Sequence, residues 1–158
     1  MLYYMRPEKQ STDSRFTRAH RGVLLIVEIL TYRLEGETEE AYRAAFPGLV
    51  VDATRIAVGA GAGAKVLKLP YPGSAEASAA VTHAAQGAPW AVLSAGVDHE
   101  TFVGKVATAV ANGAGGAMAG RALWKNSLRV SADDREALLT TRALPRLREL
   151  EAAVDRLT

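Results

Sequence analysis

The chain contains no cysteine among its 158 residues. Disulfide bonds and thiolate-ligated metal sites are therefore excluded. Its three histidines, His20, His83 and His99, are isolated in the sequence and have no second ligand at a metal-binding spacing. Surface or helix-capping roles are favoured for these histidines, and neither a metal nor an organic cofactor is expected.

Long hydrophobic runs are also missing. The longest, residues 22–30, contains Glu28 and is far shorter than the roughly 20 residues that span a bilayer. The N-terminus lacks the pattern of a signal peptide. The net charge is only +2, and basic residues are scattered among acidic ones rather than gathered in a patch with aromatics. We therefore expect a soluble cytoplasmic protein that binds neither membranes nor nucleic acid.

Hydrophobic residues make up 49% of the chain, enough for the core of one domain. Four short apolar runs have the character of β-strands, and each is followed by a helix-like stretch. The strands are predicted at residues 23–30, 64–69, 90–95 and 115–119. The helices are predicted at residues 37–45, 49–58 after Pro47-Gly48, 75–86 closed by Gly87, from the cap Asp98 to about Asn112, and from a capping box at Ser131 and Asp134 until Pro145 interrupts it.

No two of these strands are joined by a hairpin turn. Alternating strands and helices of this kind indicate βαβ units, a parallel sheet and an α/β fold. The glycine- and alanine-rich residues 58–64 resemble a nucleotide-binding loop, but such a loop follows a strand and opens a helix. Here the glycines precede a strand, so a plain helix-to-strand loop is the favoured interpretation.

Lys68 lies inside the apolar run Val66-Leu67-Lys68-Leu69-Pro70. Placing an ammonium group among apolar side chains is costly unless the group has a partner or a task. In a barrel of parallel strands this side chain can point into the interior near the C-terminal mouth, where such enzymes keep their chemistry. An amine that sheds its proton there can attack a carbonyl and form a Schiff base. The alternative is a lysine that reaches from the strand end into water.

Glu28 interrupts the run of residues 23–30 in the same way. A carboxylate among aliphatic residues needs a buried partner or a catalytic role. In Schiff-base chemistry it could move protons during carbinolamine formation, dehydration and carbon–carbon cleavage. The alternative is a simple ion pair with Lys68 or with an arginine.

The third and fourth strands end in small residues. Ser94 and Gly96 lie at the end of one strand, and Gly120 and Arg121 lie at the end of the other. Small residues let backbone amides approach an anion, and the arginine side chain supplies a forked donor, so together they indicate a phosphate site. Trp90 and Trp124 adjoin these strands and are interpreted as packing residues rather than as substrate platforms.

The same segments resemble those of the class I, metal-independent aldolases that include tagatose-1,6-bisphosphate aldolase and sulfofructosephosphate aldolase. The resembling residues are 28–32 (EILTY), 65–68 (KVLK), 93–98 (LSAGVD) and 119–124 (AGRALW). The resemblance implies a lyase that cleaves a ketose phosphate to dihydroxyacetone phosphate and an aldehyde. It makes Lys68 the Schiff-base lysine, Glu28 the acid/base residue, and Ser94, Gly96, Gly120 and Arg121 the holders of the phosphate or of a sulfonate-like anion.

The resemblance also implies the C-terminal portion of a (β/α)8 TIM barrel. Residues 1–5 resemble the end of the family's fourth strand, residues 6–21 the helix after it, and the strand of Lys68 the sixth. A half-barrel of this kind exposes sheet edges and an interior face. We therefore expect a truncated reading frame, a homo-oligomer, or association with a complementary half-barrel. The alternative functions are a non-catalytic remnant of the barrel and a phosphosugar isomerase in which Lys68 is only a charge.

Overall fold

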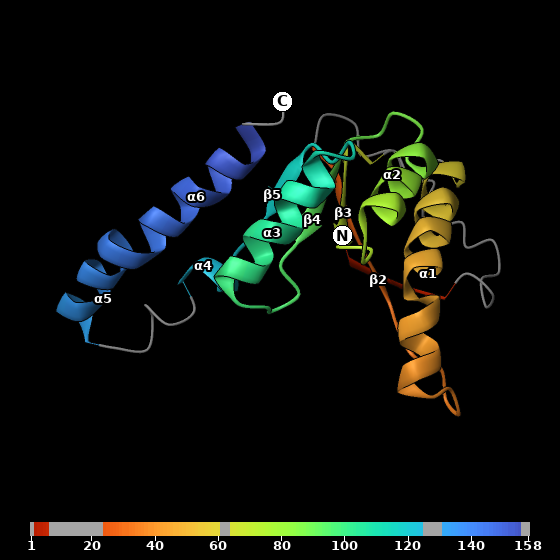
Figure 1. Cartoon of the computed structure of the whole chain (residues 1–158), viewed down its shortest axis with the longest axis horizontal. Helices are drawn as coiled ribbons and strands as arrows, with labels where there is room; N and C mark the ends of the chain where they lie inside the picture. Colours follow the sequence, from red (N-terminus) through yellow and green to blue (C-terminus); the bar gives the residue numbers. More distant parts are fainter. Residues whose placement is uncertain (1, 7–23, 61–63, 125–130, 156–158) are drawn as a thin grey trace.

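The computed structural model describes residues 2–6, 24–60, 64–124 and 131–155. They form one five-stranded sheet whose strands are all parallel and lie in the order β1-β2-β3-β4-β5 (Figure 1). The strands are β1 (Leu2–Met5), β2 (Ile26–Thr31), β3 (Val66–Pro70), β4 (Trp90–Leu93) and β5 (Gly116–Met118). The α/β class and the parallel sheet are confirmed, and the four predicted strands lie within a few residues of β2 to β5.

The core lies between one face of this sheet and the helices α1 (Glu39–Gly59), α2 (Ala75–Ala84) and α3 (His99–Val110). Alternation along the strands decides which residues enter it. Val27, Ile29, Leu67 and Leu69 are at most 1% exposed. The side chains between them point to the other face of the sheet, so the polar residues of β2 and β3 are kept out of the core.

Helix α1 runs without a break through Pro47 and Gly48, so the prediction of two helices here was wrong. A proline inside a helix removes one backbone hydrogen bond and crowds the preceding turn. In this chain the residues after it, including Val50, Ala53 and Ala57, are buried against the sheet and α2. Packing of this apolar face outweighs the lost hydrogen bond, and the helix continues.

The two predicted N-terminal helix caps, Asp98 and Ser131, are confirmed. The Asp98 carboxylate accepts a hydrogen bond from the Thr101 backbone N–H at the start of α3, and Ser131 does the same for Asp134 at the start of α5 (Ala132–Leu138). Gly87 and Gly113 follow α2 and α3 with φ angles of 85° and 95°. These left-handed conformations explain why glycine stands at both positions.

Pro145 does not interrupt the last helix. Helix α5 passes through a π-helical segment, η4 (Leu139–Ala143), into α6 (Leu144–Asp155). Pro145 is the second residue of α6, two residues after the end of η4. The wider π-helical turn just before it changes the hydrogen-bond pattern locally, so the chain continues as a helix. Leu150 of α6 is buried, and α6 packs along α3 (Figure 1).

Strand β1 pairs with β2 from Leu2↔Glu28 to Met5↔Thr31, so the strand predicted at residues 1–5 is present over Leu2–Met5. The helix expected at residues 6–21 lies outside the described residues, apart from Arg6. The five parallel strands and their helices are consistent with part of a TIM-barrel-like fold. No helix in the described parts of the chain has the length and apolar character needed to cross a membrane.

Candidate active site

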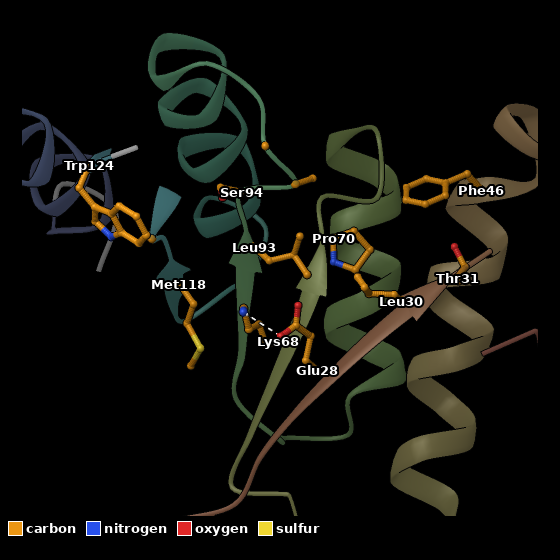
Figure 2. A pocket seen from close by; sticks show the side chains of 13 residues that line it. Glu28, Leu30, Thr31, Phe46, Lys68, Pro70, Leu93, Ser94, Met118 and Trp124 are labelled. Atoms are coloured by element: carbon orange, nitrogen blue, oxygen red, sulfur yellow. Dashed lines mark hydrogen bonds and ion pairs between the residues drawn. The ribbon is translucent and has the colours of Figure 1, made fainter. Parts of the chain in front are cut away.

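The sheet face opposite the core borders a cavity of about 530 Å³ at the carboxyl ends of the strands (Figure 2). In parallel α/β folds this edge is where ligands bind, because the strand-to-helix loops converge there. Five of the residues predicted for the site contribute to its lining. They are Glu28, Lys68, Ser94, Gly96 and Gly120.

Glu28 and Lys68 face each other across neighbouring strands. Their Cα atoms are direct register partners of β2 and β3, so both side chains project from the same face of the sheet. Lys68 Nζ donates a hydrogen bond of 2.8 Å to Glu28 Oε2 (Figure 2). The side chains are 26% and 27% exposed, so neither is buried as deeply as the apolar sequence around it suggests. The ion pair named as the alternative for Glu28 is present, and it opens onto the cavity.

A tight turn follows β4 on the cavity wall. Ala95 and Gly96 have φ angles of 49° and 80°, and the Val97 N–H donates to the Ser94 carbonyl oxygen at 3.1 Å. Two consecutive positive φ angles inside this hydrogen bond make a type I′ turn. The positive φ of Ala95 is unfavourable for a residue with a Cβ atom and represents local strain beside the cavity.

Three hydrogen-bond donors of this turn have no partner among the described residues. Within the described residues, the backbone N–H groups of Ala95 and Gly96 and the hydroxyl of Ser94 make no hydrogen bond to the protein. All three residues line the cavity. Unpaired amides of this kind can hold an anion.

The N-terminus of α3, directly after this turn, is already occupied. Asp98 accepts hydrogen bonds from the Thr101 backbone N–H at 2.9 Å and from the Thr101 hydroxyl at 2.7 Å. These two bonds hold the pKa of Asp98 below its ordinary value. The carboxylate would repel an anion at the helix end itself, so the turn of residues 94–97 is the better-suited donor group.

The end of β5 completes this wall. Leu93 pairs with Met118 across β4 and β5, so Ser94 and Gly120 follow their strands side by side at the sheet edge. Arg121 begins the short helix α4 (Arg121–Trp124), but its side chain lies outside the described part of the structure. Trp90 is 1% exposed in the core, as predicted, whereas Trp124 is 38% exposed and lines the cavity.

Two groups near the site were not found from the sequence. Arg6, after β1, donates to Glu37 Oε2 at 2.6 Å and to the Tyr32 carbonyl oxygen at 2.8 Å, and its guanidinium lies 5.9 Å from the centre of the Tyr42 ring. The Tyr42 hydroxyl lies 2.8 Å from the hydroxyl of Thr31, which reaches the cavity. These contacts join residues up to 36 positions apart, and no local sequence signal marked them.

A protein-family model described as DeoC/LacD family aldolase matches residues 15–126. The match covers more than half of the chain and includes β2 to β5 and every cavity residue named above. The chain belongs to the DeoC/LacD aldolase family. The predicted membership of the class I aldolase superfamily, and with it a lyase of the aldolase type, is confirmed at this level. The tagatose- or sulfofructose-type substrate and the roles of single residues stay predictions.

Proposed function

We propose that this protein is a Schiff-base aldolase that cleaves a ketose phosphate, of the tagatose-bisphosphate or sulfofructose-phosphate type, to dihydroxyacetone phosphate and an aldehyde. The observation that carries the proposal is the hydrogen bond of 2.8 Å between Lys68 Nζ and Glu28 Oε2 at the wall of the cavity. Membership of an aldolase family supports the reaction class. A lysine and a carboxylate are the two groups that Schiff-base cleavage needs.

The pair supplies the proton balance of the first step. Transfer of one proton from Lys68 Nζ to Glu28 Oε2 leaves a neutral amine and a neutral carboxylic acid at hydrogen-bond distance. The amine attacks the substrate carbonyl carbon and forms a carbinolamine. Glu28 then returns its proton to the carbinolamine hydroxyl, which leaves as water, and an iminium ion forms on Lys68.

Carbon–carbon cleavage uses the same carboxylate in the opposite direction. Glu28, now ionised, removes the proton from the hydroxyl on the carbon beyond the bond that breaks. That carbon becomes the aldehyde, and the bonding electron pair moves into the iminium to give an enamine. Protonation of the enamine and hydrolysis of the iminium release dihydroxyacetone phosphate and regenerate Lys68.

The phosphate end of the substrate would lie at the ends of β4 and β5. The N–H groups of Ala95 and Gly96 and the hydroxyl of Ser94 support this placement, because they are donors of cavity-lining residues and have no partner in the described part of the chain. Gly120 adds close backbone approach beside them. Arg121 is assigned to the phosphate through the family resemblance alone.

Trapping of the iminium tests the proposal. The protein is incubated with dihydroxyacetone phosphate, reduced with borohydride and digested, and the modified peptide is identified by mass spectrometry. We expect a single adduct on Lys68 and none in Lys68→Met. Lys65→Met is the matched control, because Lys65 is exposed next to the same strand and its removal should leave the adduct intact. An unmodified Lys68 in the wild-type protein, with phosphate still bound, would favour the isomerase or the non-catalytic remnant.

We also propose that, in the active form, further strands cover the sheet face opposite the core, which carries Glu28 and Lys68. A second copy or a complementary half-barrel would supply these strands. Among the described strands β1 and β5 form the two edges of the sheet, and Tyr4 on β1 is 64% exposed. Exposed edges and apolar groups favour association. Light scattering at micromolar concentration should give a mass above that of one chain, and a stable, active monomer would contradict this proposal.

A further inference from the structure

We propose that Trp124 is a substrate-binding residue whose indole N–H donates a hydrogen bond to the tetrahedral oxyanion at the end of the substrate. This inference rests on the proposed function, because it assigns a contact within the same cavity. The oxyanion is a phosphate monoester or a sulfonate, which share this geometry. The sequence alone favours a packing role for Trp124.

The position of the ring supports a ligand contact. Trp124 lines the cavity together with Lys68, Ser94, Gly96 and Gly120. As seen from Lys68 in Figure 2, its ring lies beyond Met118. A Cβ atom placed on Gly120 would lie 3.7 Å from Trp124 Cζ2 and 3.8 Å from Nε1. The nitrogen-bearing edge of the indole therefore lies over the glycine at the end of β5.

The indole nitrogen has no competing role in the described part of the chain. Its N–H makes no hydrogen bond to any described residue, although the side chain is 38% exposed and reaches the cavity. The other tryptophan differs in both respects, since Trp90 Nε1 donates to the Thr82 hydroxyl at 3.0 Å and the ring is 1% exposed. An indole N–H can only donate, which suits oxyanion oxygens that can only accept.

The neighbours of Trp124 offer the same kind of donor. The register of β4 and β5 brings the turn at Ser94 to Gly96 beside Gly120, and the N–H groups of Ala95 and Gly96 are also unpaired within the described residues. Three N–H donors, two from the turn after β4 and one from Trp124 of α4, thus belong to residues that line the cavity. The ring also adds an apolar surface to that side of the cavity, and hydrogen bonds to a charged group are stronger where water has less access.

Intrinsic fluorescence gives a direct readout, because Trp90 is shielded in the core and Trp124 faces the cavity. Inorganic phosphate should change the emission of the wild-type protein in a saturable way. By calorimetry, Trp124→Phe, which keeps an aromatic ring and removes the N–H, should bind phosphate about 10-fold or more weakly. Tyr32→Phe, an exposed residue outside the cavity lining, should bind it like the wild type. A parallel titration with methanesulfonate identifies the preferred oxyanion as the one bound more tightly.

The outcomes separate this inference from the proposed function. In Lys68→Met, phosphate should still change the fluorescence of Trp124. Trp124→Phe should still form the borohydride-trapped adduct, and its cleavage reaction should show a KM raised about 10-fold and an unchanged kcat. Trapping at Lys68 with equal phosphate affinity in wild type and Trp124→Phe would overturn the inference alone. A Trp124-dependent phosphate response without any adduct would overturn the proposed Schiff base and leave the oxyanion contact standing.

Discussion

Two ion pairs at the same edge of the sheet hold their charges in different surroundings. Arg6 is 4% exposed and donates to both oxygens of Glu37, at 2.6 and 3.3 Å, and to the Tyr32 carbonyl oxygen. Glu37 also accepts from the Leu34 backbone N–H at 3.0 Å. Lys68 and Glu28 share one hydrogen bond, are about a quarter exposed and border the cavity.

The difference separates a structural pair from a pair suited to chemistry. The contacts of Arg6 and Glu37 fix the end of β1 against the loop between β2 and α1, and a fixed guanidinium keeps its proton. Lys68 has Glu28 as its carboxylate partner and borders the cavity, so it is placed where the proposed nucleophile would meet a ligand. The number of partners and the access to the cavity, rather than the presence of an ion pair, are therefore the features on which the proposed role of Lys68 and Glu28 rests.

The largest expected effect comes from Lys68→Arg. Arginine keeps the positive charge and can still bind Glu28, but it does not lose its proton to become a nucleophile. We expect aldol cleavage to fall by about 10⁴-fold or more, with a melting temperature close to that of the wild type. Steady-state kinetics and calorimetry check both parts. Cleavage within 10-fold of wild type would contradict a nucleophilic role for this lysine.

Glu28→Gln should reduce kcat by about 10²- to 10⁴-fold, because the amide keeps the shape of the side chain but can no longer accept and return a proton. The adduct on Lys68 should still form, more slowly. Single-turnover kinetics would show whether dehydration or cleavage has become slow. An unchanged kcat would reduce Glu28 to a structural partner of Lys68.

Arg6→Met should act on stability rather than on the chemical step. Removing the arginine leaves the Glu37 carboxylate without its main partner in a partly buried site, and we expect the melting temperature to fall by roughly 5–10 °C. The folded variant should still form the adduct on Lys68. A normal melting temperature with lost trapping would reverse the roles assigned to the two pairs.

The smallest effect concerns pH. Hydrogen bonds from Arg6, and then from the Leu34 backbone, hold the pKa of Glu37 below its ordinary value, which is about 4.3. The ionised form is thus favoured by folding, so its contribution to stability is present above that value and is lost as the pH falls through the lower folded pKa. Glu37→Gln should therefore lose stability at neutral pH, and the difference from wild type should shrink below about pH 4 in a series of melting curves.

The sequence predicted the β/α alternation, the sheet face that carries Lys68, and the helix caps, because each depends on residues close together in the chain. Pro47 and Pro145 misled for a physical reason. Both disrupt an isolated helix, but the residues after Pro47 are buried against the sheet, and the π-helical turn precedes Pro145. Tertiary packing decided the first position and a local change of helix type decided the second, and the sequence displays neither.

The candidate site followed the same division. Lys68 and Glu28 were recognisable because each is a charge inside an apolar run, but their direct pairing depends on the register of β2 and β3. Arg6 and Glu37 are 31 positions apart and gave no such contrast. Trp124 adjoins a strand in the sequence just as Trp90 does, and only the structure separates the buried ring from the ring on the cavity wall.

The central claim is that the ion pair of Lys68 and Glu28, which borders the cavity, carries the chemistry, and that the buried pair of Arg6 and Glu37 does not. Its most direct test is the initial rate of borohydride trapping with dihydroxyacetone phosphate, compared among wild type, Glu28→Gln and Glu37→Gln at a temperature where all three are folded. We predict an adduct on Lys68 in each protein. It should form at the wild-type rate in Glu37→Gln and at a rate reduced about 10²-fold or more in Glu28→Gln. No adduct on Lys68 in the wild type, or equal rates in all three proteins, would contradict the account.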